Sequence, residues 1–246
     1  MELLGATTAE LSSLCEKLGH SSYRGAQIAE WIYKKGARNF ESMTNLPAAL
    51  RRELHEHATL TRSDVMDVAR SPDGASKFLL RLGDGQAVES VLLPYLNRTS
   101  VCVSTQIGCA AGCVFCATAD CGFIRNLTSG EMVDEVLTLQ EQGASGVTHV
   151  VFMGMGEPLL NLDNVLRAIG LLNAQLEIGM RRLTISSVGI TPAIRKLMEL
   201  DLQLTLAISL HAPDQSLRRK LIPISGKYPL DELMDACRDY ANATKR

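Results

Sequence analysis

Hydrophobic and polar positions change their spacing along this chain near residue 70. Before that point the apolar residues repeat at helical intervals. In residues 24–36, for example, Ile28, Trp31 and Ile32 share one helical face and a glycine ends the segment. Comparable patterns lie on either side of this segment. We therefore predict a small helical domain over residues 1–65.

The pattern that follows this domain predicts strands. Residues 70–98 contain two runs of strand-like composition, separated by the turn sequence Gly83-Asp84-Gly85. We predict a β-hairpin extension over this stretch.

A repeated order of strand and helix occupies the remaining residues, 99–246. Four apolar runs predict strands, at residues 101–106, 147–154, 181–189 and 202–210. Each precedes a segment with a helical pattern, at residues 128–143, 162–175, 191–200 and 229–244. The first of these helices begins with a capping box, in which Thr128 is followed three residues later by Glu131. Four such units in series predict an α/β fold with a parallel sheet or barrel.

Residues suited to chemistry cluster where each predicted strand ends. Cysteines follow the first strand, and "GMGEP" (residues 154–158) follows the second. Ser186 and Ser187 end the third strand, and "SLHAP" (residues 209–213) ends the fourth. Because ligands of parallel barrels bind at the carboxyl ends of the strands, these four segments predict one shared site.

Composition narrows the class of protein. The 246 residues are 46% hydrophobic, with a net charge of −2, so no overall basic character indicates nucleic-acid binding. Basic residues nevertheless outnumber acidic ones over residues 21–62, a bias also typical of a solvated helical face. No apolar run is long enough to span a membrane, and the start lacks the features of a signal peptide. We predict a cytoplasmic protein with no membrane partner, in which clustered cysteines hold metal or perform chemistry.

The cysteines after the first strand allow two interpretations. Cys109, Cys113 and Cys116 have the spacing C-x3-C-x2-C, and Cys121 lies close behind. Four thiolates could close a structural zinc site. Three thiolates could instead hold an iron–sulfur cluster and leave one iron open for substrate or cofactor chemistry.

Longer segments around these motifs resemble a known family. Three cysteines in a loop after the first strand of a βα barrel resemble the radical S-adenosylmethionine (SAM) superfamily. More narrowly, "CVSTQIGCAAGCVFCAT", "GFIRNLTSGEM", "FMGMGEPLLN" and "LAISLHAPDQSLRRKLIPI" resemble the RlmN/Cfr family, which methylates adenosine in RNA. The helical start, "YRGAQIAEWIYKKGARNFESMTNLPAALR", is similar to that family's N-terminal accessory domain, so the resemblance covers essentially the whole chain.

The resemblance implies cofactors, partners and site residues. It implies a 4Fe–4S cluster and SAM as cofactors, and an electron donor such as a flavodoxin or ferredoxin. The substrate would be RNA, namely an adenosine of 23S ribosomal RNA and, for some members, of transfer RNA, with residues 1–65 binding it. The residues that match the cluster ligands are Cys109, Cys113 and Cys116, and those that match SAM contacts are Gly156, Glu157, Ser186, Ser209, Leu210 and His211. At the third strand the alignment allows Ser187 in place of Ser186.

Two further residues match catalytic roles in the family. There, one SAM methylates a protein cysteine and a second generates the radical that moves this methyl group to C2 of adenine. Cys102 matches the cysteine that then forms a disulfide and releases the product, and Glu89 matches the proposed proton acceptor. Considered alone, Cys102 would be a packing residue and Glu89 a solvent-facing one.

The sequence also departs from the family. Its methyl-carrying cysteine lies well beyond the last predicted helix, and Cys237 does not match it. The family's barrel is TIM-like, (βα)6, whereas four units are predicted here. We therefore expect an incomplete barrel and a chain that lacks the family's C-terminal third. Other radical-SAM enzymes, an inactive fragment and a zinc-type RNA-binding module remain as alternatives.

Overall fold

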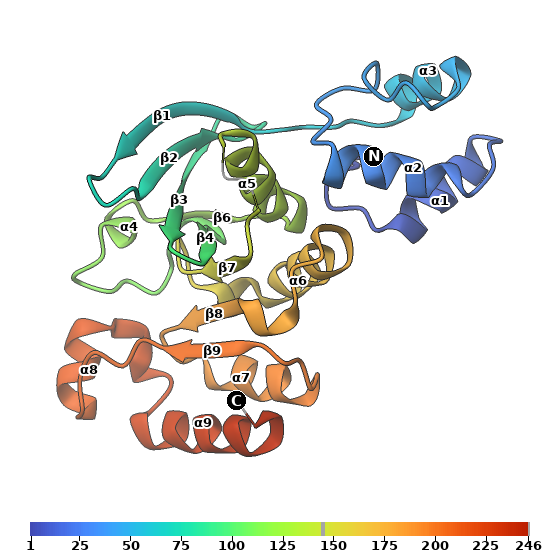
Figure 1. Cartoon of the computed structure of the whole chain (residues 1–246). Coiled ribbons are helices and arrows are strands. Elements are labelled where there is room, and N and C mark those ends of the chain that lie inside the picture. The colour runs from blue at the N-terminus through green and yellow to red at the C-terminus, as the bar shows by residue number, and fades with distance from the viewer. Residues whose placement is uncertain (144–145, 246) are drawn as a thin grey trace.

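The four strand–helix units predicted beyond residue 99 are present, and their strands lie side by side in one sheet (Figure 1). The structure, a computed structural model, describes residues 1–143 and 146–245; Arg246, the last residue of the sequence, lies outside this range. In the described part, none of the helices is long and apolar enough to cross a membrane.

Parallel strands form one half of the main sheet. They run in the order β4, β7, β8 and β9, with bounds Arg98–Val103, His149–Phe152, Leu183–Ser187 and Thr205–Ile208. The helices after them are α5 (Ser129–Glu141), α6 (Leu162–Leu176) and α7 (Thr191–Glu199), and β9 is followed by α8 (Gln215–Leu221) and α9 (Leu230–Thr244). The predicted capping box is confirmed, because Thr128 accepts from the Glu131 N–H and Glu131 reaches back to the Thr128 N–H. Helix α8 was not predicted.

Antiparallel strands form the other half of the same sheet. They are β1 (Asp64–Arg70), β2 (Ser76–Arg81) and β3 (Ala87–Tyr95), and β3 pairs antiparallel with β4. The hairpin predicted over residues 70–98 is confirmed as β2 and β3. The four strands predicted to be parallel are parallel, and the hairpin joins the same sheet, which is therefore mixed. Strand β1, which begins before residue 70, was not predicted, because it is mostly exposed and therefore carries little apolar alternation.

Smaller elements surround the cysteine loop and the helical turns. Strands β5 (Gln106–Gly108) and β6 (Phe123–Asn126) form a second, two-stranded sheet, and the helix α4 (Ala117–Asp120) lies between them. Short 3-10 turns occur at Pro158–Asn161, Met180–Arg182 and Pro223–Gly226.

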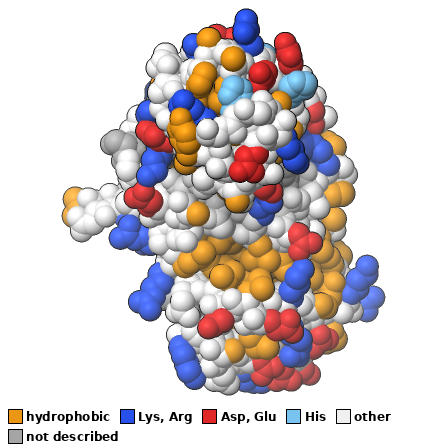
Figure 2. All heavy atoms as spheres, turned by 90° about the vertical axis from the view of Figure 1, so that its right-hand side faces the viewer, with side chains coloured by type: hydrophobic (Ala, Val, Ile, Leu, Met, Phe, Trp, Pro, Cys, Tyr) orange, Lys and Arg blue, Asp and Glu red, His pale blue; other side chains and the backbone are white. Residues whose placement is uncertain are grey.

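The N-terminal residues form the predicted helices. Helix α1 spans Thr8–Lys17, α2 spans Arg24–Ala29 and continues into a π-helical turn at Glu30–Lys34, and α3 spans Ala48–His57. Figure 2 shows charged side chains of both signs and histidines mixed over this module, at the top of the view. Many of its basic groups contact carboxylates, in the pairs Lys34–Glu177, Lys35–Glu30, Arg38–Glu141, His20–Glu53 and His55–Glu41. Many of the basic side chains that are in excess over residues 21–62 therefore form ion pairs within the protein.

Strand register separates the two faces of the main sheet. One face is fully buried beneath the helices and carries Val101, Val103, Val150, Phe152, Leu183 and Ile185, which pair across β4, β7 and β8. The next residues along, Cys102, Val151 and Thr184, also pair with one another but are only half-buried. Because successive residues of a strand point to opposite faces, this second face is open and is available for function.

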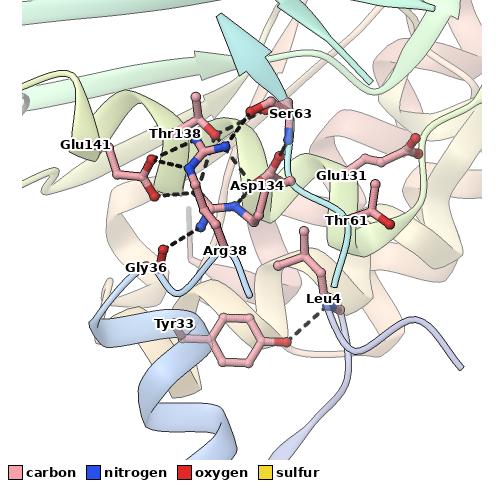
Figure 3. Close-up of polar contacts among 12 residues, drawn as sticks. Leu4, Tyr33, Gly36, Arg38, Thr61, Ser63, Glu131, Asp134, Thr138 and Glu141 are labelled. Atoms are coloured by element: carbon pink, nitrogen blue, oxygen red, sulfur yellow. Dashed lines mark hydrogen bonds and ion pairs between the residues drawn. The ribbon is translucent and has the colours of Figure 1, made fainter. Parts of the chain in front are cut away.

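A buried ionic network joins the N-terminal module to the main sheet and α5 (Figure 3). The Arg62 guanidinium is almost fully buried and donates to Asp134 and, at 2.8 Å, to Glu141. The Ser63 N–H donates to the second Asp134 oxygen at 2.6 Å, and Arg38 also pairs with Glu141. Since a buried charge without its partner is costly, this network fixes how the module sits on α5.

A second buried carboxyl lies further along α5. Glu135 is fully buried; it accepts from the Ser104 N–H at 2.9 Å and from the Ser90 hydroxyl, and its other oxygen has no partner among the described residues. Burial raises the pKa of Glu135 well above its usual value. Burial therefore favours the neutral, protonated form of Glu135.

Replacement of Arg62 tests the network between module and core. We expect Arg62→Ala to lower the free energy of unfolding by about 3–5 kcal/mol, because it leaves the Asp134 charge buried without its cation. Urea unfolding measures this, with Arg195→Ala as the control, since Arg195 and Asp239 form an exposed pair worth about 0–1 kcal/mol. The double variant Arg62→Met/Asp134→Leu should lose less of the free energy of unfolding than Arg62→Ala, because it removes both buried charges. Equal losses in the Arg62 and Arg195 variants would contradict the role of the network.

Stability as a function of pH tests the state of Glu135. A carboxyl group whose pKa is higher in the folded than in the unfolded protein binds its proton more tightly when folded. Its contribution to the free energy of unfolding is therefore largest at low pH. This contribution is lost as the pH rises from the pKa of the unfolded state through that of the folded state, by at most about 1.4 kcal/mol per pH unit. Glu135→Gln keeps the shape and cannot ionise. We expect the difference in unfolding free energy between variant and wild type to shift in favour of the variant from pH 5 to pH 8; parallel curves would refute the assignment.

Candidate functional site

The loop that carries the cysteines is closed at its base by two glycines. Strands β5 and β6 bring its ends together, and the Cys109 N–H donates to the Gly122 carbonyl at 3.2 Å. Gly108 has a φ of +72°, and a Cβ on it would lie 1.5 Å from that carbonyl oxygen. Only glycine fits this position, so the narrow base of the loop requires glycine immediately before Cys109.

Cys109, Cys113 and Cys116 line one hollow of about 310 Å³. Burial raises the pKa of Cys109, and it raises the pKa of Cys113 to about 11, with the neighbouring thiols adding to the effect on Cys113. Cys121 is exposed and does not line the hollow. The structure thus brings together the three cysteines of the C-x3-C-x2-C motif and leaves the fourth outside.

Segments after three further strands complete the walls of this hollow. The "GMGEP" segment after β7 contributes Gly154, Gly156 and Glu157, and the end of β8 contributes Ser186 and Ser187. Ser209 and His211 follow β9. The prediction of a single site at the carboxyl ends of the four strands agrees with this arrangement.

Glu157 connects two of these segments. Its side chain is 3% exposed, and its two oxygens accept from the Leu159 N–H at 3.0 Å and the Val188 N–H at 2.8 Å. Its own N–H donates to the Gln106 side chain at 2.9 Å. Burial raises the pKa of Glu157, while the Val188 N–H opposes that rise. The carboxyl therefore ties the loop after β7 to the loop after β8 at the wall of the hollow.

The two serines at the end of β8 differ in their surroundings. Ser187 is buried; its hydroxyl interacts with Glu157 and accepts from the Gly189 N–H at 2.9 Å. Ser186 is half-buried and belongs to the open face of the sheet. This difference favours Ser186 over Ser187 as the residue that faces a ligand.

The segment after β9 meets the cysteine loop through a pair of rings. The centroids of Phe115 and His211 are 4.5 Å apart, with their planes inclined by 46°. His211 has a φ of +59°, a left-handed conformation that non-glycine residues seldom adopt outside functional sites or turns. Leu210, predicted to contact the same ligand, is 37% exposed and does not line the hollow.

Glu89 and Cys102 do not line the hollow either, but they share the open face of the sheet. Cys102 pairs with Val91, which lies two residues from Glu89 on β3. The Glu89 carboxylate is 45% exposed and pairs with the Lys77 ammonium at 2.8 Å. Burial raises the pKa of Cys102 to about 11, so its thiol is protonated at neutral pH. Cys102 and the other six cysteines are free thiols in this structure, so the predicted disulfide is not formed here.

The geometry of the cysteines bears on the zinc alternative. Among the described residues, no three histidine, cysteine or acidic side chains converge closely enough to hold a single metal ion. A structural zinc site needs four converging ligands, whereas cluster ligands bind separate irons and lie further apart. The arrangement of Cys109, Cys113 and Cys116 is therefore better suited to a cluster.

Sequence reasoning missed several residues of the site. Gln106 and Val188 act through hydrogen bonds to Glu157, and such bonds leave no periodic signal in a sequence. Arg218 was quoted only within a longer motif, and it donates to the Val188 carbonyl behind the hollow.

Two family models match this chain. Residues 1–60 match the model described as "Ribosomal RNA large subunit methyltransferase N-terminal domain", and residues 103–246 match the radical SAM superfamily. The second match covers more than half of the chain. It includes every residue that lines the hollow.

Individual proteins give the same result. A probable dual-specificity RNA methyltransferase RlmN from Synechocystis sp. is 50% identical over 244 residues, which are 99% of this chain and 69% of that protein. The protein of the same description from Thermus thermophilus is 49% identical over 241 residues, 96% of this chain and 68% of that protein.

A solved structure agrees in three dimensions. The crystal structure of a radical SAM methyltransferase from Sphaerobacter thermophilus superposes with a TM-score of 0.94 at 41% identity, over 100% of this chain and 74% of that one. With its cysteine loop, its strand-end segments and these relatives, the chain belongs to the RlmN family of radical-SAM methyltransferases.

Proposed function

We propose that this chain provides the radical-SAM core of an enzyme that methylates C2 of an adenosine in RNA, in 23S ribosomal RNA and also in transfer RNA, with the methyl-carrying cysteine supplied by residues other than those of this chain. The observation that carries the proposal is the shared hollow. Three cysteines of a C-x3-C-x2-C loop line it together with the segments that follow three further parallel strands. The chain is 50% identical to a probable RlmN methyltransferase. The four parallel units correspond to part of a TIM-like (βα)6 barrel, whose open interior is the half-buried face of the sheet.

The donor set of the loop fits an iron–sulfur cluster. Thiolates are the usual ligands of such clusters, and Cys109, Cys113 and Cys116 would hold three irons. When bound, the cluster supplies the electron that starts radical chemistry on SAM. Phe115 and His211 cover one side of the hollow, where their rings would restrict the access of water.

SAM would bind beside these cysteines, against the strand-end segments. The Glu157 oxygens can accept from an ammonium group, and the Ser186 and Ser209 hydroxyls can accept or donate. Gly156 has a φ of +102°, and a Cβ on it would lie 2.6 Å from the Gln106 side chain, so glycine is required at this wall of the hollow. Leu210 lies outside the hollow and would contribute through its main chain, while His211 contributes its ring.

Cys102 and Glu89 would complete the reaction on the open face of the sheet. The Cys102 thiol is protonated at neutral pH and must lose its proton before it forms a disulfide with a methyl-carrying cysteine. Glu89 forms an ion pair with Lys77 and could accept the C2 proton of adenine. Cys237 does not match the methyl-carrying cysteine of the family. SAM cleavage does not need that cysteine, whereas methyl transfer does, so the two activities should be assayed separately.

The surface around the loop suits an electron donor. Val114, Phe123 and Ile124 are apolar and about half exposed or more, close in sequence to the cluster ligands. A flavodoxin or ferredoxin would bring its own cofactor near these residues. The N-terminal module, with its exposed Lys17 and Arg52, would contact RNA phosphates.

Anaerobic reconstitution tests the cluster. We expect about four irons and four sulfides per chain, and an electron paramagnetic resonance signal of the reduced protein that changes when SAM is added. Cys109→Ala should lose most of the iron, because it removes a ligand. Cys121→Ala is the matched control and should retain it, since Cys121 lies outside the hollow. Tight zinc binding without iron uptake, or equal iron loss in both variants, would refute the assignment.

RNA binding tests the role of the helical module. We expect Lys17→Glu/Arg52→Glu to weaken the binding of a ribosomal RNA fragment by about tenfold or more, because contacts to the phosphate backbone are lost. The slope of log affinity against log salt concentration should also decrease, by an amount that corresponds to about one to two phosphate contacts. Fluorescence anisotropy over a range of salt concentrations measures both quantities. Lys227→Glu/Arg238→Glu makes the same change of charge on the C-terminal half. Equal weakening in both double variants would indicate attraction by overall charge instead.

A further inference from the structure

A buried arginine lies directly behind the cysteine loop. Arg218, on α8, is 0% exposed and is among the largest fully buried side chains of the chain. Helix α8 is held against the loop because the Val114 N–H donates to the Leu221 carbonyl at 3.0 Å. Ile222, just after the helix, packs in a small apolar cluster with Ala111 and Cys113. Arg218 is therefore fixed next to the proposed cluster ligands.

The guanidinium of Arg218 has few partners in the described part of the chain. One nitrogen donates to the Val188 carbonyl, whereas Nε and the other terminal nitrogen have no hydrogen-bond partner there. No carboxylate forms an ion pair with Arg218 among the described residues, although sixteen such pairs occur elsewhere. A buried charge is normally paired, because removing it from water costs several kcal/mol. Arg218 thus has the surroundings of a cation whose anion is still to bind.

The position of Arg218 indicates what that anion is. Its helix is joined to the cysteine loop by the Val114–Leu221 hydrogen bond and by the contact of Ile222 with Cys113, and Cys113 and Cys237, on α9, are the groups whose negative charge would act on it. Burial lowers the pKa of Arg218, and the thiolate forms of Cys113 and Cys237 would oppose this effect. Arginine stays protonated in proteins, so a permanent positive charge is buried on the helix that contacts the cysteine loop.

We propose that Arg218 is the buried counter-charge of the iron–sulfur cluster, and that it makes the cluster easier to reduce. The inference rests on the proposed function, because it assumes that Cys109, Cys113 and Cys116 hold the cluster. Three thiolates and the cluster core together carry a net negative charge, which grows by one electron on reduction. A fixed cation nearby stabilises the reduced form more than the oxidised form, and little solvent is present to screen it.

Arg218 is a positioning and tuning residue in this scheme. Its Val188 hydrogen bond also connects it to Glu157, because the N–H of the same Val188 donates to the Glu157 carboxyl. The cation and the acid therefore hold one peptide segment from its two sides. Loss of the charge alone should leave this segment in place.

Substitution by side chains of similar length separates charge from packing. Arg218→Met and Arg218→Gln are neutral, and Arg218→Lys keeps the charge. Arg219→Met is the matched control, since Arg219 is the exposed neighbour on α8. Each protein is reconstituted anaerobically, and its midpoint potential is measured by dithionite titration with redox mediators, followed by electron paramagnetic resonance. Thermal unfolding of the same proteins without iron gives an independent readout.

We expect the neutral variants to show a more negative midpoint potential. The ratio of reduced to oxidised cluster at a fixed potential should fall at least tenfold, which is about 59 mV for a one-electron couple. Arg218→Lys and Arg219→Met should stay near the wild-type value. Without iron, the neutral variants should unfold at the wild-type temperature or above it, because they remove an unpaired buried charge.

Different failures have different meanings. A wild-type protein that takes up no iron would refute the proposed function itself. A wild-type protein that binds iron normally, with neutral variants of unchanged potential, would refute only the role of Arg218. Neutral variants that unfold at lower temperature without iron, or that fail to fold, would show that Arg218 is already compensated in the iron-free protein, and this too would overturn the inference.

Discussion

The register between β4, β7 and β8 is the constraint on which the other features depend. It sets Val101, Val150 and Leu183 side by side beneath the helices, and it therefore sets Cys102, Val151 and Thr184 side by side on the opposite face. A shift of one residue in any strand would exchange the two faces. Burial of the apolar face against α5 and α6 thus determines which side chains remain available for chemistry. It also aligns the carboxyl ends of the strands, where the loops that form the hollow begin.

Long-range polar contacts add what the sheet alone does not provide. Glu157 holds the loop after β7 against the loop after β8, and Arg62 with Asp134 holds the N-terminal module against α5. Both are buried, and both combine charge with main-chain hydrogen bonds. Such contacts are costly to break, so they give the loops and the module fixed positions. The hollow and the module are in this way parts of one arrangement.

Periodicity predicted much of the fold, because apolar alternation and helical spacing are local signals. It found the four parallel strands, the helices that follow them and the hairpin of β2 and β3. It missed β1, which is mostly exposed, and β5 and β6, which are too short to show a period. Eight of the sixteen residues that line the hollow were predicted as site residues from motifs, whereas Leu210 was predicted with them and lies outside. The hydrogen bonds of Gln106, Ser187 and Val188, and the isolation of Arg218, depend on residues distant in sequence, and no local pattern reports them.

The narrow base of the cysteine loop has a consequence for the proposed cluster site. Gly108 and Gly122 meet so closely that the fold itself closes the loop. The entropy lost in closing the loop is therefore a cost of folding and would not oppose the binding of a cluster. Uptake of iron and sulfide would then depend mainly on their supply.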